Sequence, residues 1–374
     1  MIPALKRAYA AFRGFDDETG SVPMMDGPLR PNALLDAAQV ALSLPDVDNL
    51  ALYRGELVCS SGQELLRFST ETGEFTISDR RAFDAPVSFV AAGPQDSLAV
   101  GLDGLGLMIA EGPHAGRMIK AAGERRLTCP TAALFLDADR LVVANGAAGL
   151  TTADWKRDLM ERGASGELWL IDLSRSEAPP QLIAGRLAFP SGLACAEDGK
   201  LLVSEAWLHR VVAVDVETGN APRQLLSDLP AYPGRIAQAR DGGFWLALFA
   251  PRNQLVEFVL REHEYRRRMI DAVDPAYWIA PSLSSGSSFL EPIQGGARKK
   301  LNMLKPWSPS WSYGLLARCS SAMRPLSSFH SRADGAVHGV TSCCELGGTL
   351  YIAAKGSGLI VALAIAVAAD EARQ

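Results

Sequence analysis

Two histidines and one glutamate are the side chains of this sequence best suited to move protons near neutral pH. His338 stands directly before Gly339 at the start of a late apolar run, and His330 precedes it by a short loop. Glu205 ends another apolar run, within the letters LLVSEA. Imidazole titrates close to neutral pH, and a positioned carboxylate can accept or return a proton. We therefore expect His338, Glu205 and His330 to be the acid–base groups of an ester or lactone hydrolase, unless they only form hydrogen bonds between structural units.

Arginines lie at or near several predicted turns, where their side chains are placed to bind a ligand. A guanidinium group binds a carboxylate or a phosphate through two parallel hydrogen bonds. The sequence therefore predicts an anionic small-molecule ligand, bound by Arg235, Arg332, Asn145, Ser191 and Arg252. The alternative is that these arginines are ordinary surface residues or salt-bridge partners within the fold.

A metal site is a weaker prediction than an anion site. Asp48, Asn145 and Glu205 are the side chains whose oxygen atoms could hold a divalent cation. The six cysteines do not have zinc-site spacing, and the vicinal pair Cys343 and Cys344 fits a packed strand better than a reactive site. We expect no cofactor.

The beginning and end of the sequence bear on its location. The first residues, MIPALKRAYAAFRGF, lack the long apolar core of a secretory signal, which predicts a cytoplasmic protein with free thiols. The apolar stretch from Leu359 to Ala369 is too short to cross a bilayer. We therefore expect no membrane insertion and predict that this stretch ends the fold as a buried strand or a packed helix.

The composition is that of a folded protein with a large core. The chain has 374 residues, of which 48% are hydrophobic and 21% charged. Its 37 basic and 42 acidic residues leave a net charge of -5, which argues against nucleic acid as a partner. The short basic runs at 266–268 and 298–300 are interpreted as solvated faces.

A strand-turn-strand pattern occurs six times along the chain. The clearest copy, from Phe189 to Gly219, predicts strands at 193–196, 201–204 and 210–215, with a tight hairpin at Asp198 and Gly199. Hairpin turns are predicted near Gly55, Asp96, Asp139, Gly199, Gly243 and Gly348. Most of them lie about 40 to 45 residues apart, which is the period of a propeller blade with four strands.

The predicted fold is all-β: a six-bladed β-propeller with short helical insertions. We expect one propeller domain over residues 41–369, whose innermost strands line a central channel. Helices are predicted at 154–162 and 256–273, the second within a longer insertion at 256–312. Residues 1–40, with a predicted helix at 3–15, form an extension that covers one end of the propeller or a strand edge. A pair of sandwiches is disfavoured by the even repeat count and the lack of a linker.

The copies that begin at Phe189 and Tyr232, together with LVVANGAAGL and LYIAAKGSG, resemble the strictosidine synthase-like proteins. These belong with the gluconolactonase, regucalcin and paraoxonase group of six-bladed propellers. The resemblance covers roughly residues 41–363 and implies the fold. It is weakly specific for a reaction, because this group includes lactonases, esterases, a carbon–carbon-forming synthase and non-enzymes.

The resemblance also implies where the functional residues of the group would fall. Metal-dependent lactonases of the group use a glutamate, two asparagines and an aspartate at blade starts. The corresponding positions here hold Asp48, the Pro130–Thr131 pair, Ser191 and Gly234, and Arg235 adds a positive charge beside them. This predicts that the usual calcium or zinc site is absent. The catalytic glutamate of the synthase branch corresponds to Thr341, so the same reaction is not expected.

The sequence as a whole favours a hydrolase that acts on a lactone or ester of an anionic small molecule without a metal. The alternative is a non-catalytic propeller that binds a small molecule or serves as a scaffold, and an altered carbon–carbon-forming or eliminating enzyme also stays open. Late aromatic residues are predicted either to wall a pocket or to pack over the insertion: Tyr277, Trp278, Trp307, Trp311 and Tyr313. The sequence does not indicate an oligomeric state.

Overall fold

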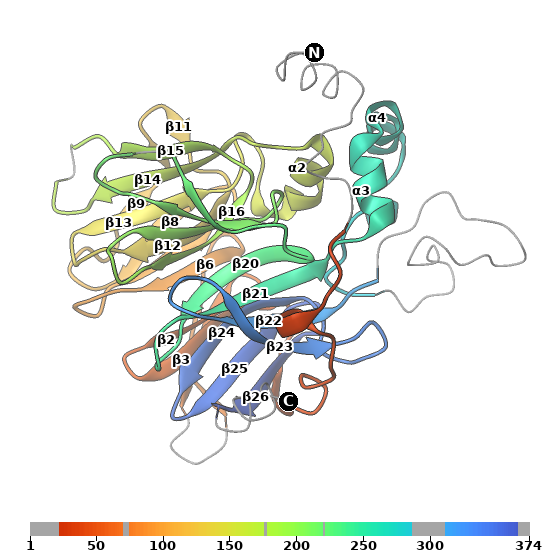
Figure 1. The fold of residues 1–374 in the computed structure, drawn as a ribbon. Helices are drawn as coiled ribbons and strands as arrows, with labels where there is room; N and C mark the ends of the chain where they lie inside the picture. The colour runs from red at the N-terminus through yellow and green to blue at the C-terminus, as the bar shows by residue number, and fades with distance from the viewer. Residues whose placement is uncertain (1–21, 70–74, 176–177, 220, 286–310, 366–374) are drawn as a thin grey trace, which may run out of the picture.

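A computed structural model describes residues 22–69, 75–175, 178–219, 221–285 and 311–365. Six four-stranded antiparallel sheets form the blades of a propeller (Figure 1). Blade one contains β2 (Val47–Tyr53), β3 (Glu56–Ser61), β4 (Glu64–Ser69) and β5 (Thr76–Ala82). Blade two contains β6 (Val87–Ala92), β7 (Leu98–Leu102), β8 (Gly106–Glu111) and β9 (Met118–Ile119). Blade three contains β12 (Pro130–Phe135), β13 (Arg140–Asn145), β14 (Gly166–Asp172) and β15 (Gln181–Leu187). The predicted six-bladed fold is confirmed.

The second half of the propeller contains the longer insertion and the closure of the ring. Blade four contains β16 (Pro190–Cys195), β17 (Leu201–Glu205), β18 (Arg210–Val214) and β19 (Arg223–Leu226). Blade five contains β20 (Ala231–Gln238), β21 (Phe244–Pro251), β22 (Gly314–Cys319) and β23 (Pro325–Ser331). Blade six contains β24 (Val340–Leu346), β25 (Thr349–Ala354), β26 (Leu359–Ala364) and β1 (Gln39–Ser43). The early strand β1 pairs with the late strand β26, so blade six contains both ends of the propeller and closes the ring.

The six predicted hairpin turns are all present, each between the first and second strands of a blade. Gly55, Gly199 and Gly348 have φ values of 80°, 77° and 84°, which only glycine adopts without strain. The innermost strand of each blade packs against the innermost strands of both neighbours, so these six strands run in the same direction around one central channel. Equivalent positions in the six copies therefore lie at similar depths in the channel.

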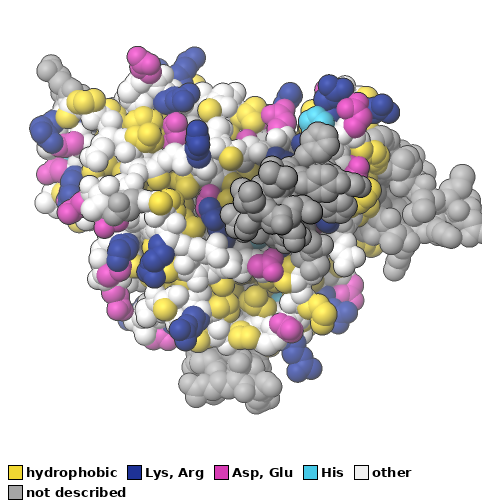
Figure 2. Space-filling model, turned by 45° about the horizontal axis from the view of Figure 1, so that its top comes forward, with side chains coloured by type: hydrophobic (Ala, Val, Ile, Leu, Met, Phe, Trp, Pro, Cys, Tyr) yellow, Lys and Arg dark blue, Asp and Glu magenta, His cyan; other side chains and the backbone are white. Residues whose placement is uncertain are grey.

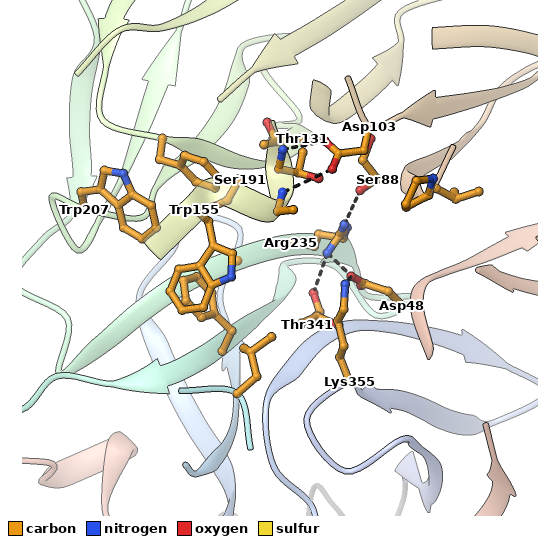
Figure 3. A pocket seen from close by; sticks show the side chains of 18 residues that line it. Asp48, Ser88, Asp103, Thr131, Trp155, Ser191, Trp207, Arg235, Thr341 and Lys355 are labelled. Carbon is orange, nitrogen blue, oxygen red and sulfur yellow. Dashed lines mark hydrogen bonds and ion pairs between the residues drawn. The ribbon is translucent and has the colours of Figure 1, made fainter. Parts of the chain in front are cut away.

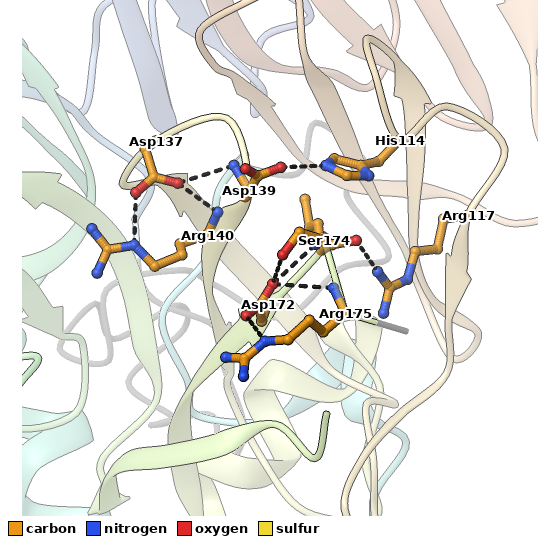
Figure 4. Close-up of polar contacts among 9 residues, drawn as sticks. His114, Arg117, Asp137, Asp139, Arg140, Asp172, Ser174 and Arg175 are labelled. Carbon is orange, nitrogen blue, oxygen red and sulfur yellow. Dashed lines mark hydrogen bonds and ion pairs between the residues drawn. The ribbon is translucent and has the colours of Figure 1, made fainter. Parts of the chain in front are cut away.

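Aspartate side chains stabilise several of the tight turns (Figure 4). Asp137 accepts hydrogen bonds from the backbone N–H groups of Asp139 and Arg140, and Asp172 does the same for Ser174 and Arg175. Such local bonds satisfy backbone groups that the sheet leaves free. Hydrogen bonds from the side chains of Ser174 and Arg175 lower the pKa of Asp172 to about 2.

Contacts between neighbouring blades combine apolar packing with a few polar bonds. One cluster between blades two and three contains Phe89, Leu107, Leu141 and Trp169. At the rim of the same junction, His114 Nε2 lies 2.8 Å from Asp139 Oδ1, and Arg117 donates to the carbonyl of Leu173 (Figure 4). Because each sheet buries both faces against its neighbours, a blade has little freedom to move alone.

Three helices gather at one side of the propeller (Figure 1). They are α2 (Trp155–Glu161), which follows the 3₁₀ turn η3 (Thr152–Asp154), then α3 (Gln254–Arg261) and α4 (His263–Ala272), which precede the 3₁₀ turn η4 (Pro275–Tyr277). The predicted helix at 154–162 is confirmed. The helix predicted at 256–273 forms as two helices, because Glu262 has a ψ of 84° and interrupts the helical backbone.

The described part of the amino-terminal extension packs on blade five. It contains a 3₁₀ turn, η2 (Gly27–Leu29). Asn32 donates to the carbonyl of Ser328 on β23, and Ser331 donates to Asp36. The helix predicted at 3–15 lies outside the described residues. A short two-stranded sheet, β10 (Ala121–Ala122) with β11 (Arg125–Arg126), follows blade two.

The surface charges, the cysteines and the helices each bear on the environment in which the protein works. Basic and acidic side chains are interspersed on the face that Figure 2 shows. All six cysteines are free thiols, which is the state that a reducing compartment maintains. None of the described helices combines the length and apolar character needed to cross a bilayer. The predicted cytoplasmic location stays a prediction.

Candidate functional site

The starts of the six innermost strands meet at a pocket of about 270 Å³ at one mouth of the channel (Figure 3). Each blade contributes one side chain to this ring: Asp48, Ser88, Thr131, Ser191, Arg235 and Thr341. The reason is geometric, because repeated strands around one axis place equivalent positions at one level. The blade-start positions identified in the sequence therefore do lie together.

Arg235 occupies the centre of the ring. Its Nη1 lies 3.0 Å from Asp48 Oδ1 and donates to the carbonyl of Thr341 at 3.5 Å, while Nη2 donates to the carbonyl of Ser88 at 2.8 Å. One guanidinium group on blade five thus bonds to blades one, two and six. Charge-assisted bonds of this kind are stronger than bonds between neutral groups.

Lys355 adds a second cation to the same carboxylate. Its Nζ lies 3.2 Å from Asp48 Oδ2, and only 8% of the Asp48 side chain is exposed. Burial raises the pKa of Asp48, but the positive charges of Arg235 and Lys355 outweigh that effect and lower the pKa below its ordinary value. The carboxylate is therefore ionised at neutral pH, and these three side chains together carry one net positive charge.

Asp103 lies at the opposite end of the pocket from Lys355 (Figure 3). Its two oxygens accept hydrogen bonds from the backbone N–H groups of Thr152 and Ala153, at 2.6 and 3.3 Å. Those N–H groups belong to the first turn of η3, which leads directly into Trp155. The negative charge of Asp103 is thus used to hold the insertion against the pocket.

Aromatic rings form one wall of the pocket. Trp155, Trp207, Phe189 and Phe249 line it together. The rings of Phe189 and Trp207 stack with centroids 4.5 Å apart, and Trp155 meets Phe249 edge to face at 5.6 Å. Trp207 also donates from Nε1 to Asp158 at 2.6 Å, which restrains the indole ring. Figure 3 shows both tryptophans on the side of the pocket away from Asp48 and Lys355.

These aromatic residues were missed in the sequence. None of the late aromatic residues that the structure describes, Tyr277, Trp278, Trp311 and Tyr313, is among the lining residues. Trp278 packs in the helical cluster, Tyr313 bonds to His330, and Trp307 lies outside the described residues. Their positions in the sequence could have identified them as pocket residues. Trp155 lies at the start of the predicted insertion helix, and Trp207 closely follows a blade strand, so both are next to the channel mouth.

The predicted acid–base residues do not line the pocket. Glu205 is fully buried, accepting a bond from the backbone N–H of Ala188 at 3.0 Å and pairing with Arg210 Nε at 2.6 Å. His338 lies between the hydroxyl of Ser312, at 2.6 Å from Nδ1, and the carbonyl of Arg332, at 2.8 Å from Nε2.

The third of these residues, His330, lies between Tyr313 and Ser328, whose hydroxyl oxygens are 3.0 and 2.7 Å from its ring nitrogens. The structure thus gives all three residues hydrogen-bond partners within the fold and does not bring them together with Arg235. Their catalytic role stays a prediction.

The predicted ligand-binding residues divide into two groups. Arg235 and Ser191 line the pocket, whereas Asn145, Arg252 and Arg332 do not. Asn145 is buried and bonds to the backbone of Cys129 and Ala147. Arg252 is 2% exposed and pairs with Glu257 and Asp228, and Arg332 is exposed beside Asp334.

The buried histidine His330 should make stability depend on pH. Burial lowers its pKa to about 4, whereas histidine in an unfolded chain titrates near 6.5. Its contribution to stability is therefore complete above about pH 6.5 and is lost as the pH falls towards 4. Between pH 7 and 5, we expect the unfolding free energy of the wild type to fall by about 1 to 2 kcal/mol more than that of His330→Asn. Urea unfolding at the two pH values measures this difference. An equal fall in the unfolding free energy of the wild type and of His330→Asn would contradict the prediction.

Comparison with solved structures agrees with the fold. A gluconolactonase from Xanthomonas campestris is 14% identical, with a TM-score of 0.54 over 92% of this chain and 97% of that one. The calcium-binding protein regucalcin from Agrobacterium tumefaciens is 11% identical, with a TM-score of 0.52 over 87% of this chain and 92% of that one. No protein-family model matches the chain, and no curated protein matches it by sequence.

At these identities the likeness shows the fold, a six-bladed propeller of the gluconolactonase and regucalcin type. The resemblance to strictosidine synthase-like proteins stays a prediction.

A divalent cation does not fit the ring at the channel mouth. Calcium takes six to eight oxygen ligands, several of them from carboxylates. This ring has Asp48 as its one carboxylate, and both of its oxygens already face cations. Among the described residues, no three His, Cys, Asp or Glu side chains are grouped to hold a metal. Asn145 and Glu205, the other weak candidates, bond elsewhere in the fold.

Proposed function

We propose that this protein hydrolyses a small lactone or ester that carries an acidic group, within the pocket at the channel mouth. The observation that supports this most is the pair of cations, Arg235 and Lys355, which share the single carboxylate of Asp48. The surplus positive charge at this end of the pocket, opposite Asp103, favours an anionic ligand and also a carbonyl oxygen on which negative charge develops. The gluconolactonase with a similar fold acts on a lactone, which agrees with this class of reaction.

The proposed reaction uses groups of this chain alone. A water oxygen adds to the carbonyl carbon of the substrate while Asp48 takes the proton of the water. Arg235 and Lys355 stabilise the resulting oxyanion. The bond from the carbonyl carbon to the leaving oxygen then breaks, and the proton passes from Asp48 to that oxygen. Its lowered pKa keeps Asp48 ionised over a wide pH range but makes it a weak base, so we expect slow turnover.

A second candidate is a propeller that binds the same kind of ligand without turning it over. It is favoured by the absence of histidine from the described residues that line the pocket. In addition, the hydroxyl of Ser191 donates to the carbonyl of Pro233 at 2.8 Å, so it is not activated as a nucleophile. The two candidates share one ligand and differ only in turnover.

A panel of lactones and aryl esters, with and without a carboxylate, tests the proposal. We expect turnover of the acidic members, unchanged by a chelator. Asp48→Asn should lower kcat about 100-fold, the usual scale for losing a general base. Lys355→Gln should raise KM about tenfold by removing a charge partner of the ligand. Arg332→Gln removes the same charge outside the pocket and serves as the matched control.

Each other outcome has a clear meaning. Turnover that the chelator abolishes would contradict the metal-free reaction. Turnover lost in His338→Asn but kept in Asp48→Asn would return the acid–base role to His338. Binding of the acidic compounds without turnover would support the second candidate. Thermal melting of every variant separates loss of function from loss of the fold.

A further inference from the structure

The pocket has more apolar wall than a ligand rich in hydroxyl groups would need. A sugar-derived acid or lactone presents many hydroxyls, and a site that recognises them needs a matching set of free hydrogen-bonding groups. The ring at the channel mouth has four hydroxyl side chains, but two of them already donate within the protein, which leaves only the buried hydroxyls of Ser88 and Thr341 for a ligand. Ser191 donates to the carbonyl of Pro233, and Thr131 donates to the carbonyl of Pro190.

The charged groups of the pocket are already bonded within the protein, so they offer few free donors or acceptors to the hydroxyls of a ligand. Asp103 accepts two backbone N–H bonds, and Asp48 faces Arg235 and Lys355. In contrast, Trp155, Trp207, Phe189 and Phe249 contribute ring surface to one cavity. Flat rings pack well on such surfaces, stacked or edge to face. The polar and aromatic parts lie on different sides of the pocket (Figure 3).

Building on the proposed function, we infer that the ligand is an aromatic acid or its ester or lactone, and not a polyhydroxylated sugar acid. The aromatic ring of the ligand lies against Trp155 and Phe249. Its acidic group points towards Lys355 and Arg235. The cavity of about 270 Å³ limits the ligand to one ring, or two small fused rings, with a short acidic arm.

The position of Trp155 supports a role in selecting the ligand. This residue lies on an insertion of blade three, outside the four strands of its sheet, and Asp103 of blade two holds the start of that insertion. Trp155 also packs on Trp207 with ring centroids 6.2 Å apart and on Phe249 with centroids 5.6 Å apart, so two neighbouring rings restrain it. A large aromatic side chain that is already packed against other rings loses little conformational freedom when a ligand binds.

Calorimetric titration with phenylacetate and gluconate tests the inference without any turnover. Both probes carry one carboxylate, and only phenylacetate has an aromatic ring. We expect phenylacetate to bind at least tenfold more tightly than gluconate. Trp155→Ala should weaken phenylacetate about tenfold and leave gluconate unchanged, because only the aromatic ring uses this wall. Lys355→Gln should weaken both probes by a similar factor.

Controls keep this test decisive. Tyr277→Ala removes an exposed aromatic side chain that is not among the lining residues, and it should change neither affinity. Phe249→Leu is a second wall variant in case Trp155→Ala does not fold. Three results would overturn the inference. Gluconate could bind as tightly as phenylacetate, the wall variants could weaken the affinity for both probes equally, or neither probe could bind. Tight phenylacetate binding without hydrolysis of any ester would retain the inference and reject the proposed hydrolase.

Discussion

Replacing Arg235 with methionine should lower the unfolding free energy by about 2 to 3 kcal/mol, one of the largest effects expected of any single substitution at the pocket. Methionine matches much of the length of arginine but cannot donate a hydrogen bond. The buried carboxylate of Asp48 would keep Lys355 as its ion-pair partner and the backbone N–H of Asn49 as a donor, and the carbonyls of Ser88 and Thr341 would lose the bond from Arg235. Blade five would lose its polar link to blades one, two and six.

Urea unfolding measures this change, with Arg332→Met as a matched loss of charge at an exposed position. The double variant Arg235→Met with Asp48→Asn should recover part of the lost stability, because it leaves no poorly paired carboxylate in the ring. If Arg235→Met is as stable as Arg332→Met, the guanidinium group does not stabilise the centre of the propeller.

The same comparison has a pH dependence with a definite sign. The pKa of Asp48 is lowered in the folded protein, so its ion pairs contribute stability above the pKa of an unfolded aspartate, which is near 3.9. That contribution is lost as the pH falls through the lower pKa of the folded state. The difference between the wild type and Arg235→Met should therefore be full at neutral pH and should shrink below about pH 4.

Glu205→Ala should lower the unfolding free energy by about 3 to 5 kcal/mol. A loss of this size is expected of a side chain that stabilises the fold. Glu205 is fully buried, so alanine would leave the N–H of Ala188 without its acceptor and Arg210 without its ion-pair partner. The bond to Ala188 joins β17 to the segment that enters blade four. Chemical denaturation of the purified variant measures the loss.

Glu205→Gln is the informative companion to this variant. Its amide oxygen can still accept the bond from Ala188, so it should lose less stability than Glu205→Ala while removing the carboxylate completely. We expect its hydrolytic activity per folded molecule to match the wild type. A stable Glu205→Gln protein without activity would contradict the structural role and restore the catalytic one.

The blades could be predicted because their signals are local. The turn at Asp198 and Gly199, and the strands on either side of it, depend on residues close in sequence. Predicted strands at 201–204 and 210–215 correspond closely to β17 and β18. The interruption at Glu262 was not predicted, because the residues on both sides of it have helical periodicity; the bend there brings α4 into contact with both α3 and α2.

The sequence by itself determined six repeats, their hairpins and the alignment of their first strands, because these follow from turn chemistry and alternation within short segments. It also indicated that Asp48 and Gly234 occupy equivalent blade-start positions, with Arg235 directly beside the second of them. Only the tertiary structure decided which groups meet. Asp48 pairs with residues 187 and 307 positions away, and contacts at such separations depend on the closure of the whole ring.

Contacts at much shorter separations decided the partners of the predicted catalytic residues, because Glu205 bonds to a residue 17 positions away and His338 to residues 26 and 6 positions away. Glu205 and His338 have the right chemistry in the sequence, but their hydrogen bonds within the fold were set by backbone groups and side chains that the blades bring to them. Side-chain type predicts what a residue can do. Which partners surround it, and so whether it faces a ligand, is determined by packing across the whole chain.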